Sequence, residues 1–229
     1  MRPPAPIAIG DGLWRWSSRH PEWHPGEFGA EVVCFAARTP DALLLLDPLL
    51  PEDPSAVLTL LDAEAAAAGS VAILITIPYH VRSAEPLWER YRADHQVSLH
   101  GHPAVLKRLS ASAADFHAIE PGRALPGGAI PHAIGRPRRY EYPLHIPSHD
   151  ALLFGDAVVG VGDRLRVWSN RRIDEDVLRF YRERFNPTLE PLVAIGAERM
   201  LMTHGSSVLE RGTEALREAL AAPPWYHRP

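Results

Sequence analysis

The chain has 229 residues, a formal charge of −4, 46% hydrophobic residues and a single cysteine. This composition provides for a sizeable core, while the absence of a basic block gives nucleic-acid binding little electrostatic support. One cysteine excludes an internal disulfide, and no apolar run approaches the roughly 20 residues of a membrane helix. The N-terminus lacks the apolar segment of a secretory signal. We therefore expect a cytoplasmic protein that binds neither nucleic acid nor membrane.

The first half of the chain alternates predicted strands and helices. Hydrophobic runs without polar interruption, above all the aliphatic stretch at 70–77, predict strands buried on both faces. Apolar residues at helical spacing, bounded by Asp53 and Gly69, predict the first helix. The predicted elements are strands at 30–38, 42–47, 70–77 and 96–101 and helices at 53–69, 83–95 and 103–110.

The second half has more strands and then returns to a helical pattern. Strands are predicted within 127–135, 138–147, 150–161 and 199–205, and helices at 174–185 and at 207–222, the last with Gly212 inside it. Two sheets packed face to face with helices outside would bury all these faces. Because no long linker divides the chain, we expect one domain spanning 1–229 in the α/β (α+β) class, a four-layer αβ/βα sandwich. Residues 73–76 should lie near the centre of their sheet.

Five stretches carry polar residues at strand ends. They are "LLLLDP", "ILITIPYHVRS", "HAIGRPRRY", "LLFGDAVV" and "MLMTHGS", in that order. Their order and spacing resemble the metallo-β-lactamase superfamily over roughly residues 28 to 215. In that family the second stretch normally reads Thr-His-x-His-x-Asp-His and the third contains Pro-Gly-His. The resemblance implies a metallo-β-lactamase-like four-layer sandwich and, for an active protein, a hydrolase.

Most of the metal-ligand positions that the resemblance implies are substituted. They fall on Ile77, Tyr79, Val81, Arg82, Arg136, Asp156 and His204. Only Asp156 and His204 keep the family's ligand type, and arginine cannot ligate because it stays protonated. The ordinary two-metal site is therefore not available. We expect no cofactor and well under one metal ion per chain; the alternative is zinc held by Asp156, His204 and the neighbouring His80.

The substituted positions suggest a binding role instead. Arg82, Arg136 and Tyr79 are the candidate ligand-binding residues, and the expected partner is a small anionic ligand. The interpretation that we favour for the arginines is that one of them neutralises Asp156, because a buried carboxylate needs a counter-charge. We expect at least one of Arg82 and Arg136 to lie against Asp156 and His204 at the bottom of the cleft between the sheets.

The sequence favours a metallo-β-lactamase-fold protein whose metal site has degenerated, a pseudoenzyme that binds a small molecule. The alternative is a hydrolase that uses one unconventionally held metal ion, or metal-free chemistry, in the same cleft. Whether the chain is an enzyme is left open, and the candidate catalytic residues are Asp156, His204 and His80.

Three further stretches have two interpretations each. The segment 19–29, with His20, Trp23 and His24, reads as a surface loop or as the border of a ligand site. The "HGH" at 100–102 reads as a surface loop rather than a ligand pair. The aromatic residues of "WRWSS" and "PPWYHRP" look exposed, which would suit a homodimer contact.

Overall fold

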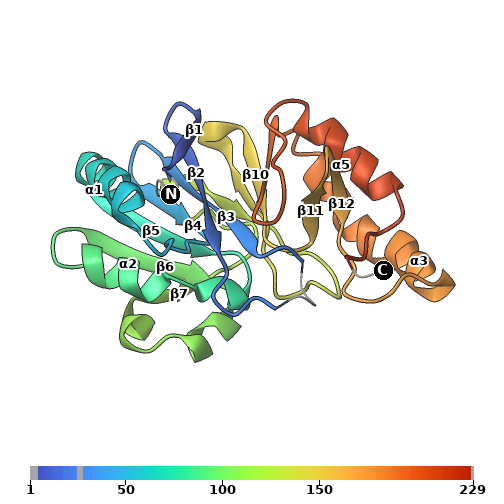
Figure 1. Ribbon diagram of the computed structural model, residues 1–229, viewed down its shortest axis with the longest axis horizontal. Helices are drawn as coiled ribbons and strands as arrows, with labels where there is room; N and C mark the ends of the chain where they lie inside the picture. The colour runs from blue at the N-terminus through green and yellow to red at the C-terminus, as the bar shows by residue number, and fades with distance from the viewer. Residues whose placement is uncertain (1–4, 25–27, 228–229) are drawn as a thin grey trace.

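The computed structural model describes residues 5–24 and 28–227, whose strands form a seven-stranded sheet, a four-stranded sheet and a two-stranded hairpin (Figure 1). The seven-stranded sheet runs, in order, through β1 (Ile7–Gly10), β2 (Leu13–Arg19), β3 (Glu31–Arg38), β4 (Leu43–Leu46), β5 (Ser70–Ile75), β6 (Gln96–Gly101) and β7 (Phe116–Ala118). The four-stranded sheet has the order β13 (Arg199–Met202), β10 (Ala151–Phe154), β9 (Leu144–Ile146) and β8 (Ile130–Pro131). The hairpin pairs β11 (Val158–Val161) with β12 (Arg164–Val167).

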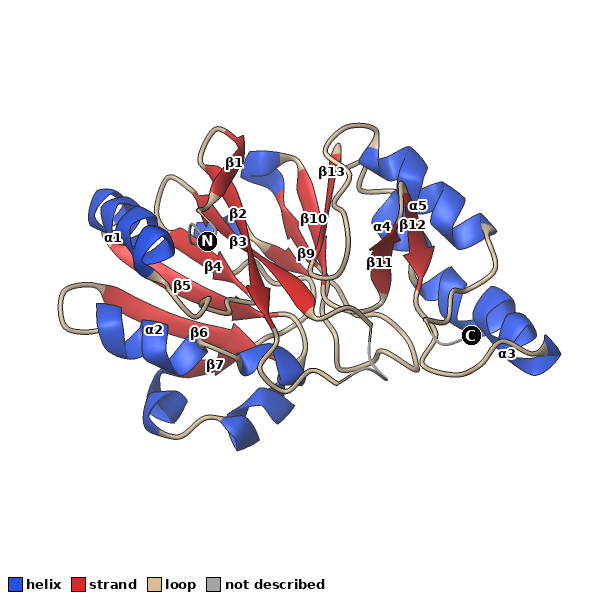
Figure 2. Cartoon of the chain, in the orientation of Figure 1, coloured by secondary structure: helices blue, strands red, loops and turns tan. Residues whose placement is uncertain are grey.

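Helices cover the outer face of each sheet, which gives the predicted four layers (Figure 2). The seven-stranded sheet carries α1 (Ser55–Ala68) and α2 (Ala84–Tyr91), and the four-stranded sheet carries α3 (Glu175–Phe180), α4 (Glu190–Val193) and α5 (Gly212–Ala221). No helix within the described ranges combines the length and the apolar character needed to cross a membrane. The predicted fold class is confirmed.

Alternating side chains of the inner strands explain why their sequences read as continuous apolar runs. In β4, Leu43 and Leu45 pack toward α1, whereas Leu44 and Leu46 pack toward the four-stranded sheet, and all four are fully buried. The strand β5 lies between β4 and β6 and is parallel to both. Its predicted position inside the sheet is confirmed. The loop that follows β5 therefore starts at an inner strand rather than at an edge of the sheet.

Aromatic side chains of the N-terminal strand β2 and of the C-terminal tail make contacts within the chain. Trp16 of β2 is 1% exposed, and its indole N–H donates to the backbone oxygen of Leu49 at 2.8 Å. In the tail, the Trp225 backbone pairs with β12, and its ring meets the Phe28 ring edge-on at 4.9 Å. These two tryptophan side chains have partners within the chain, and the homodimer contact stays a prediction.

Two predicted elements of the second half are shorter than expected. Only β8 and β9 remain of the strands predicted over 127–147, because Pro137 and Pro143 have no N–H for a sheet ladder. The chain between them turns instead, and this turn carries Arg138 and Glu141 into the site. The last helix begins at Gly212 rather than at residue 207. A Cβ on Gly212 would lie 2.6 Å from the Glu198 backbone oxygen.

Candidate functional site

The candidate site forms where strands of both sheets end. Asp47 and Thr76 directly follow β4 and β5, while Asp156 and His204 follow β10 and β13 by two residues. β4 is parallel to β5, and β10 is parallel to β13. Because the carboxyl ends of adjacent parallel strands meet at one edge, each sheet delivers a pair of polar side chains to the same place.

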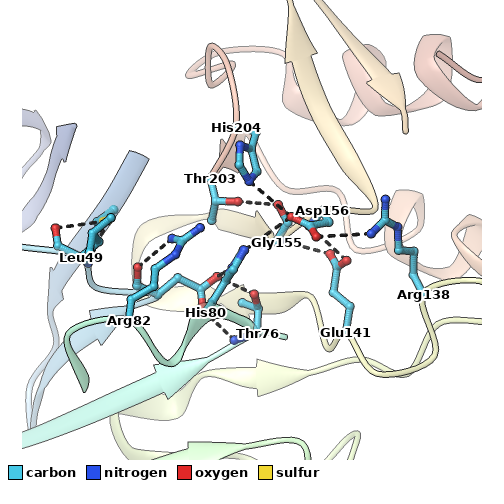
Figure 3. A network of polar contacts seen from close by, with 12 residues as sticks. Leu49, Thr76, His80, Arg82, Arg138, Glu141, Gly155, Asp156, Thr203 and His204 are labelled. Carbon is cyan, nitrogen blue, oxygen red and sulfur yellow. Dashed lines mark hydrogen bonds and ion pairs between the residues drawn. The ribbon is translucent and has the colours of Figure 1, made fainter. Parts of the chain in front are cut away.

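Three side chains from separate parts of the chain converge there (Figure 3). The Nε2 atoms of His80 and His204 lie 3.5 Å and 3.4 Å from the same oxygen, Oδ1 of Asp156. All three side chains are at most 13% exposed. His80 belongs to the one-turn helix η1 (Pro78–Val81), which directly follows the strand β5 and Thr76–Ile77. The cluster therefore joins the two halves of the fold.

Asp47 holds His80 in a defined orientation. Its Oδ2 lies 2.8 Å from Nδ1 of His80, and its Oδ1 accepts the backbone N–H of Thr76 at 2.7 Å. The Thr76 hydroxyl donates to the same carboxylate. Since a carboxylate only accepts, Nδ1 of His80 carries the hydrogen, and Nε2 of the neutral ring presents its lone pair to Asp156.

The lone pair on Nε2 of His80 faces the carboxylate oxygen Oδ1 of Asp156, and a proton or a metal ion between these two acceptors would remove their repulsion. Burial opposes ionisation of Asp156, but the contacts from His204 and His80 and the charge of Arg138 hold the pKa of Asp156 well below its usual range. For His80, burial and Arg82 act to lower the pKa, yet Asp47 and Asp156 raise it overall. Burial lowers the pKa of His204 and favours its neutral ring. Either a proton on His80 or a metal ion can satisfy this arrangement.

The cluster opens onto a cavity of about 410 Å³ with aromatic and cationic walls. The aromatic lining comprises Trp23, Phe28, Tyr79 and Trp168 together with His20 and His227, and the cationic lining comprises Arg82 and Arg108. The segment around His20 and Trp23 therefore borders a cavity, which was the second of its two sequence interpretations. Tyr79 is 67% exposed beneath the Arg108 guanidinium, 4.6 Å from its ring centre.

Comparison of the chain with known proteins identifies its fold. No protein-family model and no curated protein matches the chain. Solved structures do. The DIM-1 metallo-β-lactamase exposed to ceftazidime has a TM-score of 0.66 and 11% identity, with 95% of each chain covered. The chain has the metallo-β-lactamase fold.

Two further metallo-β-lactamases match over a similar length. The enzyme from Pontibacter korlensis has a TM-score of 0.65 and 12% identity, covering 95% of this chain and 97% of its own. FIM-1 from Pseudomonas aeruginosa, in its mono-zinc form, has a TM-score of 0.61 and 12% identity, covering 96% of this chain and 95% of its own. At such identities the likeness shows the metallo-β-lactamase fold and leaves the chemistry to the residues of this chain.

Arg138 forms the ion pair with Asp156 that was predicted for Arg82 or Arg136. Its Nη1 donates to Oδ2 of Asp156 at 3.3 Å, and its guanidinium lies 4.8 Å from the Trp168 ring centre. Arg82 instead donates to the backbone oxygen of Asp47 at 3.2 Å. Arg136 lines a different cavity. The expected counter-charge of Asp156 is therefore Arg138 rather than Arg82 or Arg136, whereas Arg82 does line the same cavity as Asp156 and His204, as expected.

Glu141 is a second residue that sequence reasoning missed. It is fully buried, and its carboxylate accepts the backbone N–H groups of Gly155 at 3.0 Å and Asp156 at 3.1 Å. Burial and then the charge of Asp156 raise the pKa of Glu141 to about 7. The only sequence signal was a glutamate inside "RRYEYPLHIP", which had been interpreted as a strand. Glu141 fixes the turn that carries Asp156.

The residues of the cluster fit a single divalent ion. One ligand atom from each of His80, Asp156 and His204 can be chosen so that all lie within 4.8 Å of one another, and this is the only such group of three in the described ranges. Two ligands of a tetrahedral zinc ion, with bonds of about 2.0–2.2 Å, lie roughly 3.4 Å apart, close to the two histidine–Asp156 separations. Oδ1 of Asp156 is buried and has no hydrogen-bond partner among the described residues.

The "HGH" stretch has no part in this cluster and is not a surface loop. His100 lies in β6, is 8% exposed, and its ring stacks on that of His117 at 5.1 Å. His102 accepts the backbone N–H of Ala104 at the start of a short helix. His100 therefore packs within the sheet, and His102 caps the short helix that follows β6.

Proposed function

We propose that the chain is a hydrolase that holds one divalent metal ion between His80, Asp156 and His204. The observation that carries this proposal is the convergence of both histidine Nε2 atoms on Oδ1 of Asp156, which is buried without a hydrogen bond among the described residues. This geometry argues against the expectation that no metal binds. It favours the second of the two functions that the sequence left open.

The donor set supports hydrolytic chemistry. Two imidazoles and one carboxylate are a common ligand set of catalytic zinc, which keeps its fourth position open. A bound divalent ion supplies Lewis-acid polarisation and an acidified water. The same donors also suit Fe²⁺, so elemental analysis decides the metal. The open side of the cluster is the cavity lined by Tyr79 and Trp168.

Residues of the chain itself would orient the site. The Asp47 carboxylate fixes the hydrogen on Nδ1 of His80 and leaves Nε2 free to bind metal, as the outer carboxylate does in many histidine metal sites. Glu141 holds the backbone of Asp156, and the Thr203 hydroxyl donates to the backbone oxygen of Gly155. These bonds restrict Asp156 and His80 to one arrangement.

The cavity walls favour a small anionic substrate with an apolar part. Arg82 and Arg108 line the cavity, and the Nε of Arg82 is buried without a hydrogen-bond partner among the described residues. A guanidinium with unused donors suits a carboxylate or phosphate. The rings of Trp23, Phe28 and Trp168 would contact the apolar part and exclude water.

The rival function is a binding protein without metal. It is favoured by the Arg138–Asp156 ion pair, in which an arginine already neutralises the carboxylate. In that case Arg138 and a protonated His80 would satisfy Asp156 permanently. The cavity would then bind its anion without hydrolysing it.

Activity assays can separate the two functions. Purified protein loaded with zinc, and separately with iron(II), is tested against anionic aryl esters, thioesters and phosphodiesters, with and without chelator. We expect turnover that the chelator abolishes and that His204→Ala lowers at least about a hundredfold, in line with loss of transition-state stabilisation at the metal. Arg164→Ala, a change at an exposed arginine on β12, is the matched control and should retain activity. Binding of such anions without turnover in any metal form would favour the rival.

A further inference from the structure

A second cavity lies beside α3, on the side of the molecule opposite α1 and α2 (Figure 1). Its volume is about 500 Å³. Its lining consists of Arg136, Pro137, Arg139, Tyr140, Asn170, Arg171, Val177, Phe180 and Tyr181. Asn170 also lines the first cavity, so the two cavities adjoin. We refer to this second cavity as the arginine cavity.

The arginine cavity concentrates positive charge on an acidic chain. Three of its nine lining residues are arginines and none is acidic, whereas the whole chain carries 28 acidic and 24 basic residues. Of the three carboxylates at the start of α3, Asp174 and Asp176 have other partners, and Glu175 has none among the described residues. Asp174 accepts the backbone N–H of Val177 at 2.8 Å, and Asp176 pairs with Arg179.

Two of the three guanidinium groups have no ion-pair or hydrogen-bond partner in the part of the chain that the structure describes. Within the described ranges, none is found for the side chains of Arg136 and Arg171. Arg139 donates to the Tyr140 hydroxyl and lies 4.7 Å from that ring's centre. Both side chains are exposed and line the arginine cavity, so their N–H donors are open to a ligand.

The backbone that carries these arginines is held in place. The N–H of Gly135, just before Arg136, donates to the Thr188 hydroxyl at 3.0 Å. The N–H of Arg171 donates to the Ser169 hydroxyl at 3.1 Å, and Ser169 is fully buried. Fixed attachment points lower the entropy lost when the side chains bind a ligand.

The floor of the cavity is apolar and aromatic. Val177 is 2% and Tyr181 is 3% exposed, and both pack into the core beneath α3. Above them, Phe180 and Tyr140 are 37% and 45% exposed. Exposed rings at the mouth of a cavity can receive a second ring by stacking or edge contact.

We propose that the arginine cavity binds an aromatic ring that carries a phosphate group, the ligand class of aryl phosphates. The guanidinium groups of Arg136 and Arg171 would bind the phosphate oxygens through paired N–H donors. The ring would lie against Phe180 and Tyr140 over the apolar floor. This site is separate from the metal cluster and does not depend on hydrolytic activity.

Calorimetric titration of the full-length protein with phenyl phosphate tests the proposal. We expect saturable binding that is weakened about tenfold by Arg136→Ala or Arg171→Ala, the scale of a lost charge-assisted hydrogen bond. Inorganic phosphate, which lacks the ring, should bind at least about fivefold more weakly than phenyl phosphate. The variant Phe180→Ala should reduce this difference without abolishing phosphate binding.

Two matched controls locate the ligand. Because the first cavity is itself proposed to accept anions with an apolar part, Arg108→Ala, which removes a guanidinium there, should leave within about twofold only the binding step that Arg136→Ala weakens, whereas Arg164→Ala, at an exposed arginine on β12, should leave the whole titration unchanged. If Arg108→Ala weakens binding as much as Arg136→Ala, the ligand occupies the first cavity and the proposal is wrong. Equal weakening by Arg164→Ala, or absence of saturable binding by the folded wild-type protein, would also overturn it.

Discussion

The loop after β5 and the loops after β10 and β13 supply the same cluster in different ways. Asp156 and His204 stand two residues beyond their strands, at the positions where the sequence resemblance places ligands. After β5, the corresponding positions hold Ile77 and Tyr79, and the donor is His80 from a single helical turn. Parallel strand register fixes a residue close to the strand end, whereas a helical turn can present a neighbouring residue. A lost motif therefore does not by itself mean a lost site.

The largest effect should come from Asp156, the residue on which both histidines converge. In Asp156→Asn the carboxylate charge disappears with little change in shape, so we expect metal affinity to fall at least about a hundredfold, beyond the range for outer-sphere changes. Competition with a chromogenic zinc chelator measures this affinity. Asp163→Asn, at an exposed carboxylate, should leave it unchanged. Equal affinities in the two variants would show that Asp156 is not a ligand.

Asp47 tests whether the loop after β5 really provides the third ligand. Asp47→Asn removes the charge that orients His80 and raises its pKa. The expected loss is about 10–100-fold in metal affinity, the usual effect of changing an outer-sphere partner. If the affinity stays at the wild-type value, His80 does not bind the metal, and only the second half of the fold contributes to the site.

Arg138 distinguishes a neutralised carboxylate from a metal ligand. The substitution Arg138→Met leaves the buried Asp156 carboxylate without its arginine counter-charge. The free energy of unfolding of the metal-free protein should therefore fall by about 3 kcal/mol. With metal bound, the loss should be clearly smaller because the ion supplies the counter-charge. Urea denaturation with and without metal measures both values. Arg90→Met, in the exposed pair with Asp62, should cost under about 1 kcal/mol. A loss that metal does not reduce would contradict this account.

The smallest effect concerns Glu85, which ties the segment after His80 to the loop at 110–112. Burial acts to raise the pKa of Glu85, but hydrogen bonds from Ser110 and Ser112 outweigh it and lower the pKa to about 2. Because the pKa of Glu85 is lower in the folded state than its ordinary value of 4.5, its ionised carboxylate stabilises the fold at pH values above 4.5. This stabilisation is lost as the pH falls toward 2. Glu85→Gln should therefore be about 1 kcal/mol less stable than wild type at pH 6. The difference should shrink between pH 4.5 and pH 3 in urea denaturation; a constant difference would exclude the tether.

Much of the fold could be predicted because the strands leave clear patterns. The run at 70–77 is apolar at nearly every position, which requires burial on both faces, and β5 has that environment. Asp156 and His204 were predictable through the family resemblance, because each keeps the implied ligand type just after a strand end that the sequence shows. His80 entered only as an alternative ligand, because the sequence does not show how a helical turn rotates its side chain.

The remaining site residues depend on contacts that are distant in sequence. Arg136 and Arg138 are equally charged and two positions apart, and only the turn between β8 and β9 decides which one reaches Asp156. Glu141 lies in a stretch predicted as a strand and was not singled out, and the backbone N–H groups of Gly155 and Asp156 hold its carboxylate inside. Such choices follow from tertiary packing rather than from local sequence.

The number of metal ions bound per chain tests the central claim most directly. Protein purified without chelator, given one equivalent of zinc and then dialysed, is analysed by elemental mass spectrometry beside His80→Ala. The account predicts about one ion per wild-type chain, one per three-residue ligand set, and close to none in His80→Ala. Wild-type protein that retains no metal, or a variant that retains as much as wild type, would contradict it.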